Sequence, residues 1–341
     1  GPLVHQFQAD LEKYLGAKHV IPCANGTDAL QIAMMGLGLQ PGDEVITADF
    51  TFAATVEVIA LLQLTPVLVD VDINNMNISL DGIRKAITPK TKAIVPVHLF
   101  GRAANMDAIM EIANEHNLYV IEDNAQAIGA DYTNKEGIKK KVGTIGHVAA
   151  TSFFPSKNLG CYGDGGAIFT NDDNLAHIIR GIVNHGMYER YHHDVVGVNS
   201  RLDSIQAGVL KAKLPNLDAY NLARKTAAKK YNEALAVNSN IVVPSFDFNG
   251  DDHVFHQYVI RITNGKRDAL LAHLQEKEIP CAIYYPIPLH SQKAYADVRY
   301  KEEDFPVTNQ LCKEVIALPM HTELDDEQIK FITDTVLEFL K

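Results

Sequence analysis

The chain has 341 residues, 47% of them hydrophobic, and a formal net charge of −11 at pH 7. That length allows two domains around a large core, and the acidic balance argues against a binding surface for nucleic acid or anionic membranes. Four widely spaced cysteines, no signal peptide and no apolar run of membrane-spanning length predict a cytoplasmic, reducing environment without disulfides or a zinc site. The chain begins with Gly1-Pro2 rather than Met, which indicates a missing N-terminal piece or a cloning scar.

Residues 1–127 alternate amphipathic helices with short buried strands. Helical spacing covers 4–15, 29–37, 80–87, 106–116 and a stretch ending near 64, and strands are expected at 44–48, 66–71, 93–98 and 118–121. This alternation predicts an α/β domain with a largely parallel sheet, whose ligands bind beyond the carboxyl ends of the strands. Four side chains follow strand ends: Phe52, His98, Asp123 and Gln126. Each alone also fits a core aromatic, a capped histidine or a solvated polar group, and only their shared location favours a site.

The segment Asn25-Gly26-Thr27-Asp28 precedes the second predicted helix. A glycine and a hydroxyl residue at a helix start form an anion site, because free N–H groups and the helix dipole both point at the ligand. The same pattern also suits an ordinary N-cap by Thr27 or Asp28, and taken alone it favours the N-cap.

The second half of the chain predicts a bridge between two domains. An exposed hairpin is expected at 131–141, strands at 146–154, 166–170 and 256–262, and helices at 174–184, 205–236, 267–277 and 325–340. The long helical stretch, interrupted near Pro215, predicts a large domain at 1–236 and a smaller C-terminal domain at 237–341. His192-His193 has no third ligand at suitable spacing, so we expect no metal site.

Lys157 lies between a predicted strand and the glycine-rich run 160–166. A lysine held among apolar and small residues has a lowered pKa, and its neutral amine can form a Schiff base. The alternative is a surface lysine in a turn, which would be favoured if the flanking segments carried no signal of their own.

Six ordered motifs together resemble the DegT/StrS family of sugar-nucleotide aminotransferases. They are Asn-Gly-Thr-Asp-Ala-Leu at 25–30, Thr-Phe-x-Ala-Thr at 51–55, Glu-Asp-Asn-Ala-Gln-Ala at 122–127, Phe-Pro-Ser-Lys-Asn-Leu-Gly at 154–160, Gly-Asp-Gly-Gly-Ala at 163–167 and Asn-Ser-Arg-Leu-Asp-x-Ile-Gln-Ala at 199–207. The resemblance runs over essentially the whole chain. It implies a fold-type-I enzyme that uses pyridoxal 5′-phosphate (PLP) and its pyridoxamine form (PMP). The implied architecture is a large domain with a mostly parallel mixed sheet flanked by helices, plus a smaller C-terminal α/β domain.

The resemblance also implies residue roles. Lys157 would form the Schiff base with PLP and then move a proton, and Asp123 would pair with the ring nitrogen. The remaining cofactor contacts would be Gly26, Thr27 and Ser152 at the phosphate, Phe52 stacked on the ring, Gln126 beside it and Asn199 reaching the cofactor of a second subunit. The active site would therefore be shared across a homodimer interface.

The implied reaction is ping-pong transfer of an amino group from L-glutamate to the C3 keto group of a nucleotide-linked hexose. Related dehydratases replace the lysine with histidine, so Lys157 favours transamination. The expected sugar contacts are Ser156, Arg201, Tyr284, Tyr285 and His290; for His290 a structural role is equally expected. The run 157–167 resembles the branch that acts on a UDP-linked 2-acetamido-3-keto-uronate for surface polysaccharide or lipopolysaccharide synthesis. Tyr284-Tyr285-Pro286 departs from the His-Tyr-Pro of that branch and keeps a dTDP-linked 3-keto-6-deoxyhexose open.

Three other functions are weighed against transamination. A non-catalytic regulatory protein on the same fold has no support from a DNA-binding helix pair or a basic face. Another PLP reaction, such as dehydration, would be distinguished from transamination by the mass of the product, which shows whether an amino group has replaced an oxygen. An NAD-dependent enzyme is disfavoured because Asn25-Gly26-Thr27 is not the dinucleotide motif G-x-G-x-x-G.

Overall fold

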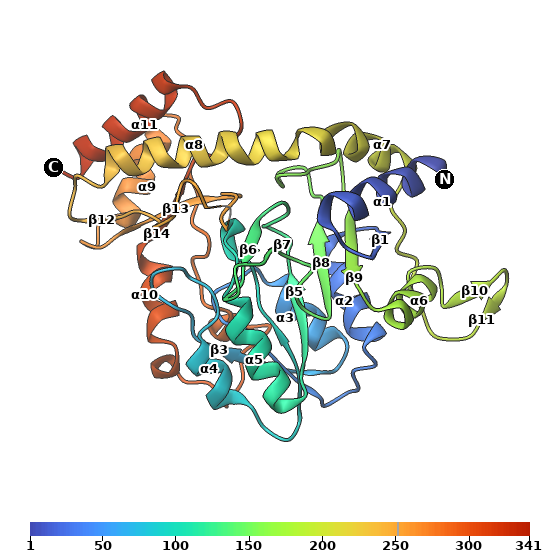
Figure 1. Ribbon diagram of the computed structural model, residues 1–341. Helices are drawn as coiled ribbons and strands as arrows, with labels where there is room; N and C mark the ends of the chain where they lie inside the picture. Colours follow the sequence, from blue (N-terminus) through green and yellow to red (C-terminus); the bar gives the residue numbers. More distant parts are fainter. Residues whose placement is uncertain (251) are drawn as a thin grey trace.

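A computed structural model describes residues 1–250 and 252–341 (Figure 1). Its main feature is a seven-stranded sheet in the order β1-β9-β8-β5-β4-β2-β3. The strands are β1 (His19–Cys23), β2 (Glu44–Ala48), β3 (Thr65–Val69), β4 (Thr91–Val95), β5 (Tyr119–Asp123), β8 (Val148–Ser152) and β9 (Gly166–Thr170). Only β9 runs against its neighbours, so the sheet is mostly parallel, as predicted.

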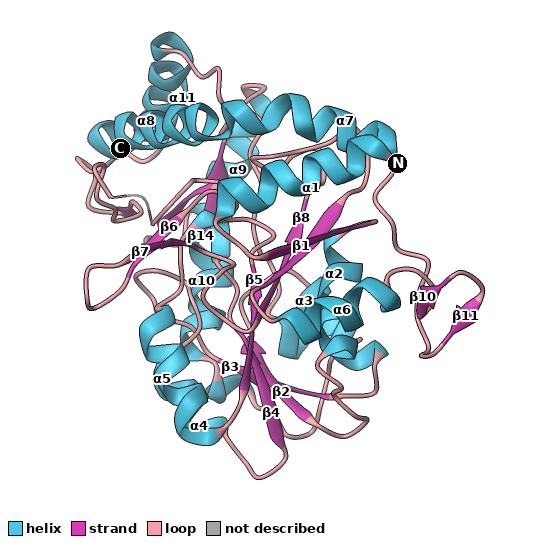
Figure 2. Cartoon of the chain, turned by 45° about the vertical axis from the view of Figure 1, so that its right-hand side comes forward, coloured by secondary structure: helices cyan, strands magenta, loops and turns pink. Residues whose placement is uncertain are grey.

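Helices cover both faces of this sheet, and the side-chain alternation of the strands explains why. In β4, Ile94 belongs to the apolar cluster under α4 (Leu80–Ala86) and α5 (Met106–His116). Its neighbours Ala93 and Val95 pack on the other face, against α2 (Gly26–Gly36), α3 (Ala54–Leu61) and α6 (Asp173–Ile182). Figure 2 shows these two groups of helices on opposite sides of the strands. Strands buried on both faces read as continuous apolar runs, which made them recognisable in the sequence.

A long helical connection crosses the molecule above the sheet (Figure 1). It comprises α7 (Ser204–Lys213), the 3₁₀ turn η2 (Leu214–Asn216) and α8 (Leu217–Leu235), and α1 (Pro2–Leu15) packs beside α7. The predicted interruption near Pro215 is confirmed. Proline removes a backbone donor and tightens the chain there.

The C-terminal region forms a second, three-stranded antiparallel sheet. It contains β12 (Ile241–Val242), β13 (Tyr258–Ile262) and β14 (Val315–Leu318), packed with α8, α9 (Arg267–Glu276) and α11 (Asp326–Phe339). Between these elements the chain returns to the large sheet through η3 (Leu289–Ser291), η4 (Glu302–Asp304) and α10 (Pro306–Glu314). The Asp70 carboxylate after β3 accepts hydrogen bonds from the Val307 and Thr308 amides at the start of α10. The division near residue 236 stays a prediction, and these contacts tie part of the C-terminal region to the first sheet.

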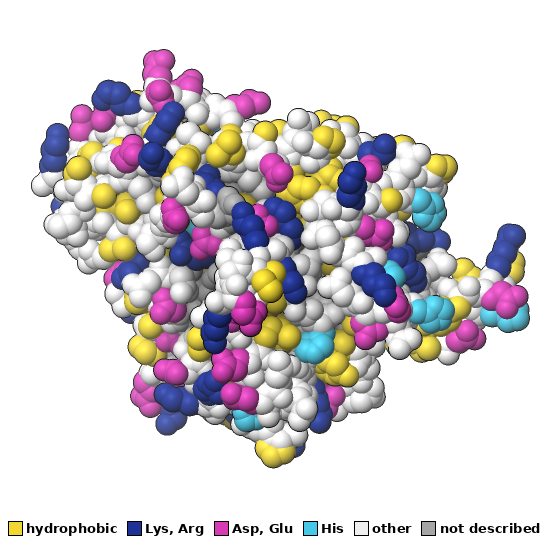
Figure 3. Space-filling model, in the orientation of Figure 1, with side chains coloured by type: hydrophobic (Ala, Val, Ile, Leu, Met, Phe, Trp, Pro, Cys, Tyr) yellow, Lys and Arg dark blue, Asp and Glu magenta, His cyan; other side chains and the backbone are white. Residues whose placement is uncertain are grey.

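Short elements complete the fold. The expected hairpin is β6 (Asp131–Thr133) and β7 (Lys139–Lys141), and η1 (Leu99–Gly101) follows β4. A second hairpin, β10 (Met187–Glu189) and β11 (His192–His193), projects from the body in Figures 1 and 2 and was not predicted. In the described residues no helix has both the length and the apolar composition to cross a bilayer. Acidic and basic side chains are interspersed on the face shown in Figure 3.

Candidate active site

A cavity of about 610 Å³ lies where β2, β4, β5 and β8 end. Ten of the predicted site residues line it: Gly26, Thr27, Phe52, Asp123, Gln126, Ser152, Ser156, Lys157, Tyr284 and Tyr285. The tyrosines arrive from the C-terminal region, more than 120 positions after Lys157 in the sequence. The fold therefore brings most of the expected set around one cavity.

Asp123 ends β5 and is held through both its backbone and its carboxylate. Its backbone N–H donates to Pro96 O (2.9 Å), and its Oδ2 and Oδ1 accept from Thr55 Oγ1 (2.7 Å) and the Ala125 amide (3.1 Å). Burial raises the pKa of Asp123, while the two hydrogen bonds and the charge of Lys157 lower it in part. A cation placed against this carboxylate would satisfy it further.

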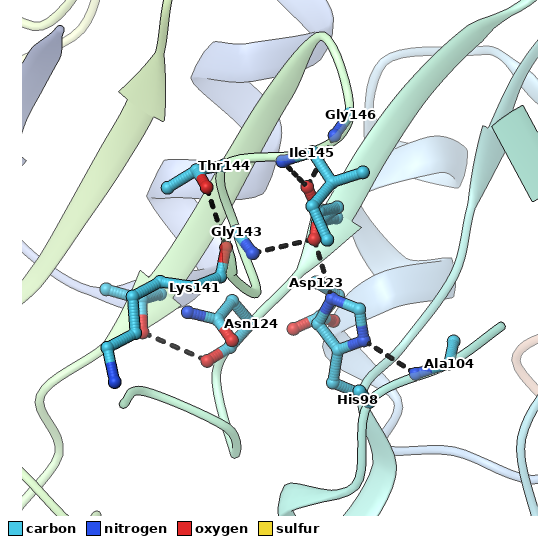
Figure 4. Close-up of polar contacts among 12 residues, drawn as sticks. His98, Ala104, Asp123, Asn124, Lys141, Gly143, Thr144, Ile145 and Gly146 are labelled. Atoms are coloured by element: carbon cyan, nitrogen blue, oxygen red, sulfur yellow. Dashed lines mark hydrogen bonds and ion pairs between the residues drawn. The ribbon is translucent and has the colours of Figure 1, made fainter. Parts of the chain in front are cut away.

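The neighbouring residue Glu122 has a different environment, and Figure 4 labels the residues that donate hydrogen bonds to it, His98, Gly143, Ile145 and Gly146. Its carboxylate accepts four hydrogen bonds, from His98 Nε2 (2.8 Å) and from the backbone amides of Gly143 (2.6 Å), Ile145 (2.7 Å) and Gly146 (2.6 Å). The Ala104 amide donates to His98 Nδ1 (3.0 Å), so Nε2 carries the proton that Glu122 accepts. Burial opposes ionisation of Glu122, but these donors lower its pKa overall. Glu122 and His98 do not line the cavity, and their hydrogen bonds hold the end of β5 in place.

Lys157 follows β8 in a tightly folded segment. Burial lowers the pKa of its amine from 10.5 to about 8, and the charge of Asp123 offsets part of that effect. The adjacent Asn158 anchors the segment, because its Nδ2 donates to Asn221 Oδ1 (2.7 Å) and to Val254 O (2.9 Å). A side chain at Gly160 would approach Pro155 O to 2.4 Å, so the turn requires glycine there. At neutral pH a useful fraction of this amine is unprotonated and able to act as a nucleophile.

The part of the cavity lined by Gly26 and Thr27 suits an anion. Helix α2 begins at Gly26, and its N-cap is Asn25, whose Oδ1 accepts from the Asp28 amide (2.7 Å). The predicted cap by Thr27 or Asp28 is wrong, because the helix starts earlier than its apolar periodicity does. The first amides of a helix have no intrahelical partner and attract negative charge. A Cβ at Gly26 would lie 2.6 Å from Ser152 Cβ, so glycine lets these two lining residues pack together.

Aromatic side chains form one wall of the cavity. Tyr285 lies 5.9 Å from Phe50, 6.3 Å from Phe100 and 6.4 Å from Phe52, measured between ring centroids. Gln126 supports this wall: its Oε1 accepts from the Phe100 amide (2.6 Å) and its Nε2 donates to Tyr285 Oη (3.1 Å). Phe52 remains 58% exposed, so its ring is available to cover a bound planar group.

Three predicted site residues do not line the cavity of this chain. His290 is buried against Asp49, with 2.7 Å between Nδ1 and Oδ2, and its ring stacks on Phe305 at 4.4 Å. These contacts agree with the structural role that the sequence left open for His290, which joins η3 to the end of β2, and a direct sugar contact from it stays a prediction. Asn199 and Arg201 are exposed on the segment before α7, where Arg201 Nη1 donates to Asn184 Oδ1 (3.1 Å).

The cavity also contains lining residues that the sequence did not single out. Thr51, His256 and Gln257 are among them. Thr51 Oγ1 and His256 Nδ1 are buried without a hydrogen-bond partner among the described residues. Thr51 lies inside a quoted motif, so that signal was available, whereas His256 precedes a strand in an apolar run and gives no local sign of a site.

This lining fits PLP. PLP combines a phosphate, an aromatic ring with a basic nitrogen, and an aldehyde. For the phosphate the cavity offers a helix N-terminus and a serine hydroxyl, and for the ring it offers an incompletely satisfied carboxylate beside an aromatic wall. For the aldehyde it offers a lysine whose pKa is lowered. Gly26 leaves room at the anion end where a side chain would collide.

The comparisons with known proteins agree along the whole chain. The model of the DegT/DnrJ/EryC1/StrS aminotransferase family matches residues 1–337. The chain is 47% identical to a "Pleiotropic regulatory protein" of Geobacillus stearothermophilus, over 100% of this chain and 90% of that protein. It is also 47% identical to a UDP-2-acetamido-2-deoxy-3-oxo-D-glucuronate aminotransferase of Pseudomonas aeruginosa, over 97% and 89%. The crystal structure of a DegT DnrJ EryC1 StrS aminotransferase from Brucella abortus matches with a TM-score of 0.93 and 43% identity, covering 99% and 90%.

Proposed function

The chain belongs to the DegT/DnrJ/EryC1/StrS aminotransferase family, and on that premise we propose which residues act in its cavity and which substrates it takes. It is a PLP-dependent aminotransferase of fold type I. The observation that carries the proposal is the placement of Lys157 and Asp123 in one cavity beside an anion-binding helix start.

The proposed roles follow from these environments. When bound, PLP supplies an electron sink for the bonds around the substrate's amine-bearing carbon. Asp123 would pair with the ring nitrogen and keep it protonated, and the protonated ring would supply the cation that this buried carboxylate lacks. Lys157 is the residue that would hold the cofactor's aldehyde group, because its amine has a lowered pKa, and its Nζ would carry the proton that the reaction moves. The amides of Gly26 and Thr27 and the Ser152 hydroxyl bind the phosphate, Phe52 covers the ring, and Gln126 fixes Tyr285 beside it.

The proposed substrates are L-glutamate as donor and a UDP-linked 2-acetamido-3-keto-uronate as acceptor, in the synthesis of a surface polysaccharide or lipopolysaccharide sugar. The name of the Pseudomonas relative and the match of residues 157–167 to that branch support this choice. Ser156, Tyr284 and Tyr285 line the cavity and are the proposed sugar contacts from this chain. Because such sugars are made from intracellular nucleotide precursors, we place the reaction in the cytoplasm.

A homodimer would complete the site. Large apolar side chains are exposed around the cavity mouth and on the segments before and within α7: Phe52, Phe154, Tyr162, Tyr191, Val196 and Ile205. Asn199 and Arg201 lie on the same stretch, outside their own chain's cavity. A two-fold partner would bury this apolar surface and bring Asn199 to the neighbouring phosphate and Arg201 to the neighbouring sugar carboxylate.

The acceptor is tested by offering UDP-linked and dTDP-linked keto sugars to the pyridoxamine form and following the return of the PLP absorbance. We expect the UDP-uronate to react fastest. Preference for a dTDP-linked 6-deoxy sugar would establish the alternative that Tyr284-Tyr285-Pro286 keeps open. Arg201→Lys should weaken sugar binding more than glutamate binding, because lysine cannot form the bidentate contact with a carboxylate. An equal effect on both half-reactions would contradict a sugar-clamp role.

The name of the Geobacillus relative favours testing one second function, regulation without catalysis. A regulator would keep its cellular effect when Lys157 is replaced by alanine, and it would bind its partner without PLP. Loss of the cellular phenotype together with loss of transamination would leave only the enzymatic function.

A further inference from the structure

A buried histidine faces the same cavity as Lys157 and has no role in the reaction described above. His256 lies just before β13, lines the cavity and is 5% exposed. Its Nδ1 has no hydrogen-bond partner among the described residues. Leaving a buried polar atom without a hydrogen bond costs free energy. We therefore expect a hydrogen-bond partner of His256 Nδ1 inside the cavity.

The segments that carry His256 and Lys157 are bonded directly to each other. Asn158, next to Lys157, donates from Nδ2 to Val254 O (2.9 Å), two residues before His256. The charge of Lys157 also acts on the His256 imidazole. The two side chains therefore belong to one rigid junction, with little freedom to move apart.

The backbone around His256 is fixed from the other side as well. Arg224, on α8, donates from Nη1 to Phe255 O (3.2 Å) and His256 O (3.3 Å), and the Gln257 amide donates to Phe100 O (3.3 Å). These hydrogen bonds fix the backbone on both sides of His256, so its ring is held in one place. A residue that positions a reactive group needs this rigidity.

The charge state of His256 suits an acceptor. Burial lowers its pKa well below 6.5, and the cations Lys157 and Arg224 lower it further. The imidazole is therefore neutral at pH 7 and carries one free lone pair. Within residues 1–250 and 252–341 the Lys157 amine has neither a hydrogen bond nor an ion pair, so its donors are also unused.

We propose that His256 is a positioning residue for Lys157, which accepts a hydrogen bond from the lysine amine and holds it in line for attack. This inference rests on the proposed role of Lys157. No proton changes hands in it, because the imidazole is the weaker base of the two. The other ionisable groups around the pair are Asp123, on the Lys157 side, and Asp164, Tyr284 and Tyr285 in the cavity lining.

The test uses protein stripped of cofactor and exposed to formaldehyde with cyanoborohydride at a series of pH values. Only a neutral amine is methylated, so the pH dependence of labelling at Lys157, followed by peptide mass spectrometry, reports its pKa. In the unmodified chain we expect a midpoint at about 8. His256→Leu removes an acceptor that favours the charged amine, and should lower the midpoint by about one pH unit.

His256→Leu should therefore make Lys157 react faster with the reagent at pH 7 while turnover with PLP falls by about tenfold or more, since a free amine is badly oriented. A general structural defect would not speed the labelling. His256→Gln keeps an acceptor and should restore the midpoint in part. His253→Leu is the matched control: it removes a buried histidine from the same segment that does not line the cavity, and the midpoint should stay at about 8.

An unchanged or raised midpoint in His256→Leu overturns the inference, as does an equal shift in His253→Leu. Borohydride treatment of the PLP-loaded protein separates this failure from a failure of the proposed function. A cofactor label on a residue other than Lys157 would contradict the proposed catalytic role of Lys157. A label on Lys157 without a shift of the labelling midpoint in His256→Leu would contradict only the proposed role of His256.

Discussion

Glu122 and Asp123 are consecutive carboxylates at the end of one strand, and they differ in how completely the protein satisfies them. Glu122 receives four hydrogen bonds and has a lowered pKa. Asp123 receives two and has a raised pKa. Both are buried, so burial alone does not separate them. The difference lies in the number of donors that the fold places around each.

This contrast separates structural support from chemistry. A carboxylate whose acceptors are all occupied gains nothing from a ligand, whereas one held by two donors at a cavity still needs a cation. Glu122 and His98 hold β5 in place, and Asp123 is left for a positively charged partner. Lys157 shares the second condition, because desolvation lowers the pKa of its amine and no bonding partner for it lies within residues 1–250 and 252–341. Incomplete satisfaction beside a cavity is therefore what Asp123 and Lys157, the two proposed catalytic residues, have in common.

Replacing Lys157 tests the chemistry most directly. We expect Lys157→Ala to lower turnover by at least about 10⁴-fold, because both the nucleophile and the proton carrier are lost. Borohydride should no longer attach PLP to the chain. Turnover close to that of the unmodified protein would contradict the assignment of Lys157.

Asp123→Asn should sharpen the contrast between the two carboxylates. Turnover should fall by about 10²–10³-fold because the charge that keeps the ring nitrogen protonated is removed. The melting temperature of the cofactor-free protein should stay the same or rise, since burial already disfavours the charged form of this side chain. A marked fall in the melting temperature would show that Asp123 is structural after all.

Glu122→Gln is the matched substitution at the neighbouring position, and it should act on stability. The amide would present an NH₂ group to backbone donors that now point at a carboxylate, so we expect a loss of about 3–5 kcal/mol in the free energy of unfolding. Denaturant titration measures the change. If Glu122→Gln unfolded like the unmodified protein and lost only activity, the distinction between the two acids would fail.

The pH dependence of stability gives the smallest effect. Lys157 binds its proton with a pKa of about 8 when folded and near 10.5 when unfolded, so the unfolded chain holds more protons between these values. The free energy of unfolding of the cofactor-free protein should therefore fall as pH drops from about 10.5 to about 8. Lys157→Met should remove about 1–2 kcal/mol of that fall, since a pKa unit corresponds to about 1.4 kcal/mol and partial exposure reduces the effect. Parallel curves for the two proteins would contradict a lowered pKa.

The elements with strong apolar periodicity were predicted well. The strand at 44–48, the helix at 106–116 and the break near Pro215 agree with β2, α5 and η2. Boundaries at capped ends were less accurate, as in α2, where the cap at Asn25 adds a turn before the apolar pattern begins. The hairpin β10–β11 was missed because its short strands are exposed and carry no alternation.

The sequence by itself determined the α/β architecture and pointed to Lys157 and Asp123, because strand periodicity and ordered local motifs are properties of neighbouring residues. Only the tertiary structure decided that His290 bonds to Asp49, that Glu122 accepts four hydrogen bonds, and that His256 lines the same cavity as Lys157. These outcomes depend on segments distant in sequence meeting at one place, and on counting the donors that reach each buried atom. No local pattern encodes that count, since it arises from the packing of the whole fold.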